Sequence, residues 1–241
     1  MIAIVDYDTG NLRSVADAMR RIGAGFTITS DPAVLRGAER VLLPGVGEAS
    51  TAMAKLRERG LDAVIPALTK PVLGICIGMQ LMCLDSEEGG ARCLGIFPAH
   101  VRRLGNNTTA AQTANTGAPV AGTRPTPTAD ATDGTGARTT VCGARSTTPD
   151  AAGGSPLKIP HVGWNTIGSL SGPLFGGLDE ETYVYYVHSF AAEICGATIA
   201  RTDYGGAFSA ALGRGNFFGT QFHPEKSGSA GERILRNFLK L

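Results

Sequence analysis

The first third of the chain alternates between short apolar runs and longer segments with helical periodicity. Each run is about four residues long and rich in Ile, Val, Leu or Phe, which is typical of strands buried in a sheet. The strands predicted in this way are residues 2–5, 26–29, 40–43 and 71–75. Between them, residues 12–22 and 53–65 carry apolar side chains every three or four positions, which predicts helices. This alternation implies βαβ units and a parallel sheet with helices on both faces.

The second half of the chain has strand patterns that follow one another more closely. β-Branched and aromatic residues predict strands at 182–188, 197–201, 208–212 and 217–222, and a closing helix carries Ile234, Leu235, Phe238 and Leu239. The hairpin-like spacing indicates antiparallel strands that extend the same sheet. The expected fold class is therefore α/β, with an open, mostly parallel central sheet and an antiparallel extension in the C-terminal half.

Residues 106–155 differ from the rest of the chain in composition. They contain no Leu, Ile, Phe, Tyr or Trp and are dominated by Thr, Ala, Gly and Pro. Such a segment cannot bury enough apolar surface to offset the entropy that is lost on ordering. We expect a disordered insertion inside one domain that spans residues 1–241, with the flanks 101–104 and 157–160 meeting as adjacent strands.

The overall composition argues against several classes of partner. The 241 residues carry a formal net charge of +1, and the charged residues are dispersed, so no basic stripe points to nucleic acid. No apolar run reaches the length of a membrane span, and the N-terminus lacks the pattern of a secretion signal. The five cysteines include no C-x-x-C pair, so a disulfide framework is not expected. We therefore expect a cytoplasmic protein with reduced thiols and with neither nucleic acid nor a membrane as partner.

A candidate nucleophile lies where the fourth predicted strand ends. Cys76 stands in the middle of Gly74-Ile75-Cys76-Ile77-Gly78, between a strand and a segment rich in helix formers. Glycines flank the nucleophile in such an elbow because a Cβ at either place would clash. The turn also places Cys76 at a helix N-terminus, which favours a thiolate. The alternative is a buried cysteine in a glycine-rich turn, so the decisive question is whether the chain supplies a base.

His223 is the histidine best placed in the sequence to act as that base. Of the four histidines, only His223 is followed two residues later by a carboxylate, Glu225. Side chains at i and i+2 of an extended backbone point to the same side, so Glu225 can orient the imidazole. A metal site is disfavoured because no further ligands stand at zinc-like spacing, and no phosphate-binding glycine motif is present. We expect neither a metal nor an organic cofactor.

The oxyanion that forms when a thiolate attacks a carbonyl needs hydrogen-bond donors already in place. One is expected to be the backbone N–H of Ile77, directly after the nucleophile. A second is expected from the loop after the third strand, at Gly45 or Val46. An ordinary strand-to-helix turn is the alternative reading of that loop.

These residues resemble a known family. The segments Gly74–Gln80 and Phe222–Ser227, GICIGMQ and FHPEKS, are similar to those of class I (triad) glutamine amidotransferases, whose domain is flavodoxin-like. Within that class the chain looks like the glutaminase subunits of imidazole glycerol phosphate synthase. The matching segments are residues 6–15, 43–49, 74–80, 86–90, 160–165, 185–190 and 220–228.

The resemblance implies a reaction and a partner. Cys76 would attack the side-chain amide of L-glutamine and form a glutamyl thioester, while His223 moves the proton and Glu225 orients it. The ammonia would pass to the HisF cyclase subunit, a (βα)8 barrel that makes imidazole glycerol phosphate and AICAR in L-histidine biosynthesis. Because Val46 lies between two glycines, its peptide plane is free to rotate, and we hypothesise that partner docking sets this oxyanion donor.

The resemblance also assigns binding residues. The substrate-binding set is Gly47, Gln80, Glu88, His188, Ser189 and Phe190, with Glu88 pairing with the α-ammonium group. The positions that match the cyclase contact are Asn11, Trp164 and Lys226.

Two departures from the family pattern are Asp8, where a glycine is usual, and the segment Glu48–Ser50. Four alternatives stay open: another class I amidotransferase, a γ-glutamyl thiol hydrolase, a catalytically silent subunit and a redox-sensing thiol protein.

Overall fold

The computed structural model describes residues 1–8, 11–45, 47–105 and 157–241. The predicted insertion at 106–155 and Val46 therefore lie outside the described residues. The described part is built on a seven-stranded sheet with the order β11-β12-β13-β4-β3-β1-β2. Its strands are β1 (Ile2–Val5), β2 (Phe26–Thr29), β3 (Arg40–Leu43), β4 (Val72–Ile75), β11 (Thr198–Asp203), β12 (Ala207–Arg214) and β13 (Phe217–Thr220).

The strand directions confirm the predicted fold class. Strands β2, β1, β3, β4 and β13 are parallel neighbours, and β12 and β11 continue the sheet in antiparallel pairing. All residues of β1 and β4 are buried, as expected of strands covered on both faces. The parallel strands therefore extend from one edge of the sheet, β2, to β13, and the antiparallel extension forms the other edge.

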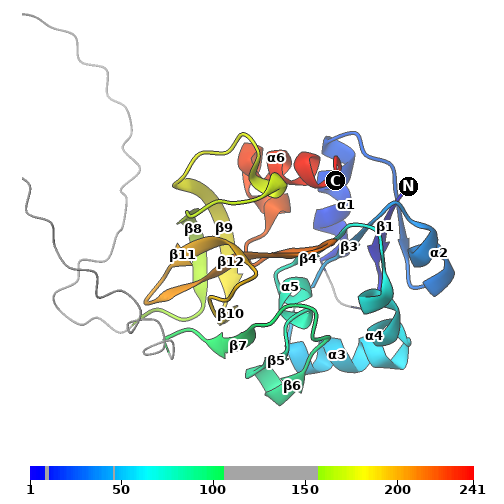
Figure 1. Cartoon of the computed structure of the whole chain (residues 1–241), viewed down its shortest axis with the longest axis horizontal. Helices are drawn as coiled ribbons and strands as arrows, with labels where there is room; N and C mark the ends of the chain where they lie inside the picture. Colours follow the sequence, from blue (N-terminus) through cyan, green and yellow to red (C-terminus); the bar gives the residue numbers. More distant parts are fainter. Residues whose placement is uncertain (9–10, 46, 106–156) are drawn as a thin grey trace, which may run out of the picture. The chain divides into compact units, whose positions relative to one another are not determined.

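Helices cover both faces of the sheet. Figure 1 shows α1 (Leu12–Arg21) and α6 (Gly228–Phe238) on one side and α3 (Ala49–Glu58) and α5 (Ile77–Leu81) on the other. Helix α1 packs through an apolar stripe of Val15, Ala16, Ala18 and Met19. The short helix α2 (Pro32–Gly37) is capped at its N-terminus by Asp31, whose side chain accepts a hydrogen bond from the backbone N–H of Ala33.

The single helix predicted over residues 53–65 is wrong in its continuity. The segment forms α3, then α4 (Leu61–Val64), then a 3₁₀ turn, η1 (Ile65–Ala67). Gly60 separates the first two with a φ of 65°, a left-handed conformation that ends a helix. The apolar periodicity continues across the break because Leu56 and Leu61 are both buried in the same core.

The strand predicted at 182–188 exists, but its predicted place in the central sheet is wrong. This strand, β9 (Thr182–His188), pairs only with β8 (His161–Ile167) among the described strands, and the two form an antiparallel ribbon. One face of the ribbon is buried and the other is exposed. A two-stranded ribbon with one buried face shows the same alternation of apolar and exposed side chains as a strand of the main sheet, so the pattern does not distinguish the two.

The flanks of the insertion do not pair with each other as predicted. The strand before the insertion, β7 (His100–Arg103), instead lies between β10 (Phe190–Ala192) and β5 (Asp85–Ser86), in a small sheet that ends with β6 (Ala91–Arg92). Residues 157–160 precede β8 and are not a strand. Pairing with β10 and β5 satisfies the backbone hydrogen-bonding groups on both sides of β7, so β7 needs no partner strand from the other flank.

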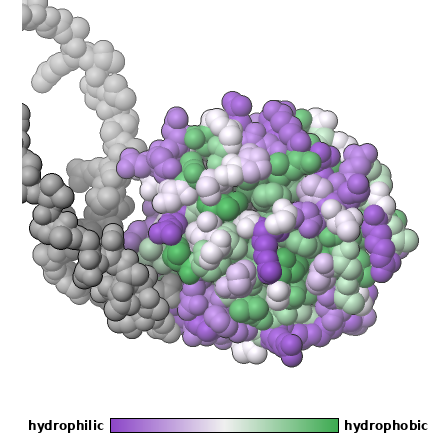
Figure 2. All heavy atoms as spheres, in the orientation of Figure 1, coloured by the Kyte–Doolittle hydropathy of each residue, from purple (hydrophilic) through white to green (hydrophobic). Residues whose placement is uncertain are grey.

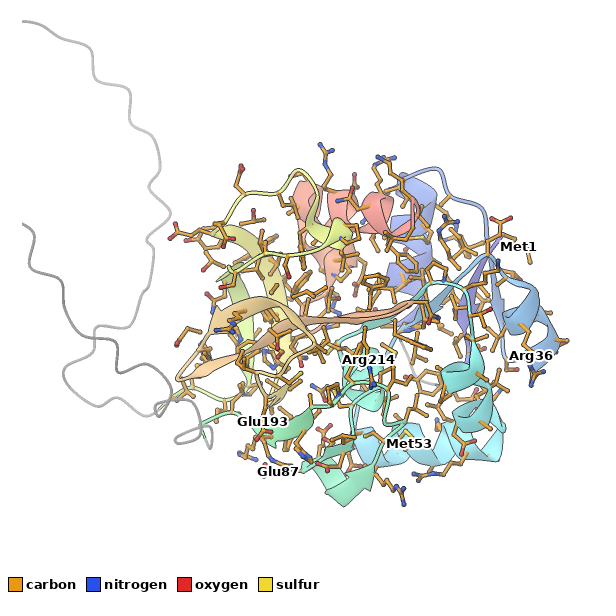
Figure 3. The ribbon with its side chains drawn as sticks, viewed as in Figure 1. Met1, Arg36, Met53, Glu87, Glu193 and Arg214 are labelled. Carbon is orange, nitrogen blue, oxygen red and sulfur yellow. The ribbon has the colours of Figure 1, made fainter. Side chains whose placement is uncertain are left out.

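Arg102 ties the small sheet together. Its guanidinium lies 3.1 Å from Asp85 Oδ1, 3.7 Å from Glu87 Oε1 and 3.5 Å from Glu193 Oε1. Figure 3 shows Glu87 and Glu193 close together beside β7. Over the face seen in Figure 2, hydrophilic and apolar side chains are interspersed. Within the described ranges, no helix combines the length and the apolar character needed to cross a bilayer.

Candidate active site

The sharp turn predicted at Cys76 is present between β4 and α5. Cys76 has φ 54° and ψ −111°, a conformation that residues with a Cβ rarely adopt. A Cβ on Gly74 would lie 2.6 Å from the carbonyl oxygen of Gly78, and a Cβ on Gly78 would overlap the carbonyl oxygen of Leu43. The two glycines are therefore required by the close approach of β4, α5 and β3.

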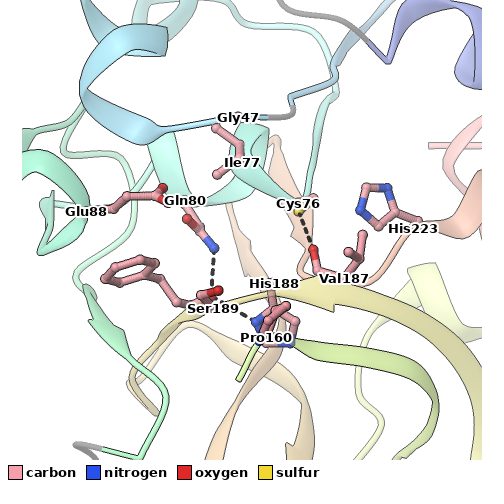
Figure 4. Close-up of a pocket in the computed structure, with 11 residues that line it drawn as sticks. Gly47, Cys76, Ile77, Gln80, Glu88, Pro160, Val187, His188, Ser189 and His223 are labelled. Atoms are coloured by element: carbon pink, nitrogen blue, oxygen red, sulfur yellow. Dashed lines mark hydrogen bonds between the residues drawn. The ribbon is translucent and has the colours of Figure 1, made fainter. Parts of the chain in front are cut away.

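His223 lies beside this turn, in the segment that follows β13. Its backbone N–H donates to the carbonyl oxygen of Tyr185 at 2.9 Å, which fixes the segment against β9. Figure 4 shows the imidazole next to Cys76 at one end of a pocket. The Nε2 atom of His223 is buried and has no hydrogen-bond partner among the described residues. An unpaired ring nitrogen at this place can take up or release a proton during a reaction.

Glu225 holds the other side of the imidazole ring. His223 Nδ1 lies 2.8 Å from Glu225 Oε1, and both side chains are almost completely buried. Glu225 belongs to a 3₁₀ turn, η4 (Pro224–Lys226), so the predicted contact is made, but not along an extended strand. The turn brings the carboxylate back toward the ring because Pro224 cannot continue a β-ladder.

The charge state of His223 is set by its neighbours. Burial works to lower its pKa, but the adjacent Cys76 sulfur and the Glu225 carboxylate outweigh burial and raise this pKa to about 10. The imidazole is therefore stabilised in its protonated form beside the sulfur. This is the electrostatic arrangement of a thiolate–imidazolium pair.

Asn11 makes the second contact to Glu225. Its Nδ2 donates to Glu225 Oε1 at 2.6 Å, and Asn11 is buried. The Arg21 guanidinium also donates to the backbone carbonyl of Glu225 at 3.1 Å. The structure therefore brings Asn11, which the family resemblance assigned to a partner contact, into the interior behind the His223–Glu225 pair.

A pocket of about 350 Å³ opens on Cys76. It collects most of the residues predicted for catalysis and substrate binding, and Figure 4 shows nearly all of them around one space. The predicted residues that line it are Gly47, Cys76, Ile77, Gln80, Glu88, His188, Ser189, Phe190 and His223. Pro160 and Val187 line it as well; both lie inside segments that match the family, but neither was predicted as a site residue.

The polar groups of the pocket are unevenly satisfied. Gln80 donates from Nε2 to Phe190 O at 2.9 Å and to Gln221 Oε1 at 3.0 Å, while its own Oε1 is buried without a partner among the described residues. Glu88 accepts a hydrogen bond from the backbone N–H of Ala49 at 3.0 Å. Burial raises the pKa of Glu88, the Ala49 N–H opposes this, and nearby Glu48 adds to it.

Of the predicted oxyanion residues, Ile77 is the first residue of α5 and Gly45 lies in the loop after β3. The backbone N–H of Ile77 has no intrahelical partner, because the first amides of a helix never do. Gly45 packs on the turn without lining the pocket, and a Cβ on it would lie 2.7 Å from the backbone nitrogen of Gly78. The hypothesis about Val46 falls on a residue outside the described ranges.

The unusual Asp8 has a local explanation. It adopts a positive φ of 61°, as the glycine usual at this place would allow. Arg59 Nη2 pairs with its carboxylate at 2.5 Å, and Lys55 Nζ donates to its carbonyl oxygen at 2.7 Å. These contacts hold the strained residue in place, and Asn11 still reaches Glu225.

The remaining predicted partner residues, Trp164 and Lys226, are both exposed. Trp164 is 55 % exposed and packs edge-on against Tyr185, its cross-strand partner, with ring centroids 5.9 Å apart. We define the outer face of the ribbon as Val162, Trp164, Tyr183, Tyr185 and Val187. Lys226 is exposed and directly precedes Ser227, whose side chain accepts a hydrogen bond from the Tyr185 N–H at 3.0 Å. Lys226 is therefore near Tyr185 on the ribbon.

Two buried polar residues were missed by the sequence analysis. Gln221 stands two positions before His223 and donates from Nε2 to Cys76 Sγ at 3.7 Å. His161 Nδ1 lies 3.0 Å from His188 Nε2, and burial lowers the pKa of these two histidines to about 4 and about 3. Both residues lie inside motifs that matched the family, which was the available signal.

Comparison with known proteins identifies the family of this site. The chain matches the family described as "Glutamine amidotransferase class-I" over residues 3–241. The chain belongs to this family. Among curated proteins it is 44 % identical to "Imidazole glycerol phosphate synthase subunit HisH" of Bacteroides thetaiotaomicron, with 100 % of this chain and 99 % of the relative covered. The HisH subunit of Shewanella oneidensis is 38 % identical, with 100 % of this chain and 96 % of the relative covered.

Solved structures agree on the fold of this class I amidotransferase. A structure described as "glutamine amidotransferase" superposes with a TM-score of 0.63 at 15 % sequence identity and covers 100 % of this chain and 98 % of its own. PurLQS from Thermotoga maritima superposes with a TM-score of 0.57 at 16 % identity and covers 99 % of this chain and 97 % of its own. At these identities the likeness concerns the fold alone.

Proposed function

We propose that the chain is the glutaminase subunit of an imidazole glycerol phosphate synthase in the cytoplasm. It hydrolyses L-glutamine to glutamate and ammonia and delivers the ammonia to a HisF cyclase subunit in L-histidine biosynthesis. The HisH relatives at up to 44 % identity over the whole chain support the pathway. The observation that carries the chemistry is the shared pocket of Cys76 and His223, with Glu225 held against the ring at 2.8 Å.

In the first half-reaction the Cys76 sulfur attacks the side-chain carbonyl carbon of glutamine. The thiol proton resides on His223, and the carbonyl electron pair moves onto oxygen, where the Ile77 N–H stabilises the oxyanion. When the tetrahedral intermediate collapses, the C–N bond breaks and His223 gives its proton to the leaving nitrogen. Ammonia and a glutamyl thioester are the products, and His223 is left neutral.

In the second half-reaction water cleaves the thioester. The neutral imidazole of His223 takes a proton from water as its oxygen attacks the thioester carbon. Collapse of this second tetrahedral intermediate breaks the C–S bond and releases glutamate, and the thiolate returns beside the protonated imidazole. Glu225 keeps the ring in one orientation through both halves, because Nδ1 faces its carboxylate and Nε2 faces the pocket.

The pocket has suitable groups for the amino-acid end of glutamine. Glu88 supplies a carboxylate for the α-ammonium group, and the unpaired Oε1 of Gln80 supplies a buried acceptor for a substrate N–H. The backbone around Ser189 and Phe190 closes the opposite wall, with Gly47 beside α5. A cavity of about 350 Å³ is in the range of small-molecule sites.

The outer face of the ribbon is the surface we propose for the cyclase. Val162, Trp164 and Tyr183 are each more than half exposed, and aromatic residues gathered on one face are typical of protein interfaces. Trp164 and Lys226 provide an apolar anchor and a charge for this contact. Asn11 contributes from the interior, through its hydrogen bond to Glu225 within η4, next to Lys226.

A coupled assay tests the proposal. Ammonia release from L-glutamine is measured for the purified chain alone, with a HisF cyclase, and with Cys76→Ser in place of the wild type. We expect ammonia only with intact Cys76, and transfer into imidazole glycerol phosphate only when both subunits are present. A chain that cleaves γ-glutamyl peptides equally well with and without the cyclase is instead a γ-glutamyl thiol hydrolase. A chain whose Cys76 responds only to peroxide contradicts the proposal.

A further inference from the structure

Gln221 lies against the nucleophile from inside the protein. Its side chain is completely buried, and its Nε2 is 3.7 Å from Cys76 Sγ. A hydrogen bond to sulfur has this longer reach because the sulfur atom is large. Gln221 directly follows β13, the strand that pairs in parallel with β4 and so ends beside the same turn.

The orientation of the Gln221 amide is determined by its neighbours. The carbonyl oxygen of Phe190 can only accept hydrogen bonds, so the Gln80 side-chain nitrogen must face it at 2.9 Å. The same Gln80 nitrogen lies 3.0 Å from one of the two terminal atoms of the Gln221 side-chain amide. Because that atom must accept a hydrogen bond, it is the amide oxygen of Gln221. The Gln221 nitrogen is therefore the atom that faces the sulfur, and an amide flip would break two buried hydrogen bonds.

A second set of contacts holds the Phe190 carbonyl itself. His188 Nδ1 lies 2.9 Å from Phe190 O and must carry the hydrogen, so its Nε2 accepts from His161 Nδ1 at 3.0 Å. Both rings are neutral, since burial keeps the pKa of each well below its usual value. The buried chain of donors thus runs from His161 to the carbonyl against which Gln80 and Gln221 are aligned.

The sulfur has neighbours of opposite polarity. The carbonyl oxygen of Val187 lies 3.9 Å from Cys76 Sγ and favours the thiol, whose hydrogen it can accept. The Gln221 N–H favours the thiolate, because a donor is stabilised by an anionic acceptor more strongly than by a neutral one. Both groups are in place before any substrate arrives.

We propose that Gln221 is a further catalytic residue whose side-chain N–H stabilises the Cys76 thiolate, and that Gln80 aligns it for this purpose. The inference rests on the proposed function, in which the thiolate is the attacking species. It also gives Gln80 a positioning task besides the substrate contact expected from the family resemblance. In the tetrahedral intermediates the sulfur is no longer anionic, so the Gln221 contact acts on the resting thiolate and on the thiolate expelled from the thioester.

The test measures the thiolate directly. Cys76 is alkylated with iodoacetamide over a range of pH in the full chain, and modification is followed on the Cys76 peptide by mass spectrometry, which separates it from the other cysteines. Gln221→Met keeps the length of the side chain and removes the donor. We expect its alkylation midpoint to rise by about one pH unit, a tenfold loss of thiolate below the midpoint. We expect kcat for glutamine to fall while KM changes little.

Two further variants separate this role from a packing effect. Gln221→Glu keeps the acceptor for Gln80 but turns an oxygen toward the sulfur, so its midpoint should rise further than that of Gln221→Met. Thr220→Val is the matched control, because Thr220 is equally buried and its hydroxyl donates to Phe222 O at 3.1 Å. Its midpoint should equal that of the wild type.

The possible outcomes are distinct. Midpoints of Gln221→Met and Gln221→Glu equal to the wild type, or an equal rise in Thr220→Val, overturn the inference. If Gln221→Met does not fold, the Gln221→Glu profile decides alone. A wild-type chain that releases no ammonia with the cyclase contradicts the proposed function, whereas ammonia release with unshifted variants contradicts only the role of Gln221.

Discussion

Replacing Asn11 by alanine removes the 2.6 Å hydrogen bond to Glu225 Oε1. Asn11 also caps α1, but its side chain makes no capping hydrogen bond, so the helix loses little. A hydrogen bond to a charged group contributes about 1.5–3 kcal/mol. In a domain of this size, 1 kcal/mol shifts the melting temperature by about 2–4 °C, so the variant should melt about 3–12 °C lower.

An internal role of Asn11, through Glu225, and a direct contact of Asn11 with the cyclase predict different results. Thermal unfolding followed by circular dichroism should give the lower melting temperature, and ammonia release should fall because Glu225 no longer holds the His223 ring. Asn11→Asp is the informative second variant. It brings two carboxylates together, so it should lose more stability at neutral pH and regain it as the pH falls and one of them is protonated. An unchanged melting temperature together with weaker cyclase binding would refute the internal role and support a direct partner contact.

Four further outcomes follow from the geometry. Gly78→Ala should destabilise the fold by about 1–3 kcal/mol in chemical denaturation, whereas Gly25→Ala, with open space around it, should not. Cys76→Gly should be more stable than Cys76→Ala by about 1 kcal/mol, since it relieves the strained backbone; equal unfolding free energies would contradict this. The pKa of His223 is raised from 6.5 to about 10, so the stability advantage of the wild type over His223→Gln should be full below pH 6.5 and disappear as the pH rises toward 10. A stability difference between the wild type and His223→Gln that stays constant across that pH range would exclude a charged His223–Glu225 pair. Trp164→Ala should weaken cyclase binding in calorimetry, and unaltered binding would remove the outer face of the ribbon from the interface.

The elements that could be predicted from the sequence depend on local pattern. Strands β1, β3 and β4 are mainly apolar runs, whereas β2 alternates apolar residues with threonine. The turn at Cys76 was predicted from its flanking glycines, which the close approach of neighbouring backbone requires. The break at Gly60 was missed because two short helices that pack on one core share a single periodicity. The pairing of β9 was missed because alternation shows that a strand is half-buried without naming its neighbour.

The contacts that escaped prediction in the site are long-range. Asn11 and Glu225 are 214 residues apart, and Gln221 reaches Cys76 across 145 positions. The sequence does not indicate the partners of asparagine or glutamine, because a buried side-chain amide can form a hydrogen bond with any nearby donor or acceptor. The roles of the pocket residues came from family resemblance, and only the fold brings Gln80, Phe190 and Gln221 into one hydrogen-bonded group.

Val187 gives the ribbon a property that its exposed aromatic residues do not have. Val187 is 37 % exposed and belongs to the outer face, while its carbonyl oxygen lies 3.9 Å from the nucleophilic sulfur. A single amino acid thus touches both the surroundings of the subunit and the reacting atom. The exposed surface of the outer face is therefore separated from the carbonyl group beside Cys76 by the bonds of a single residue.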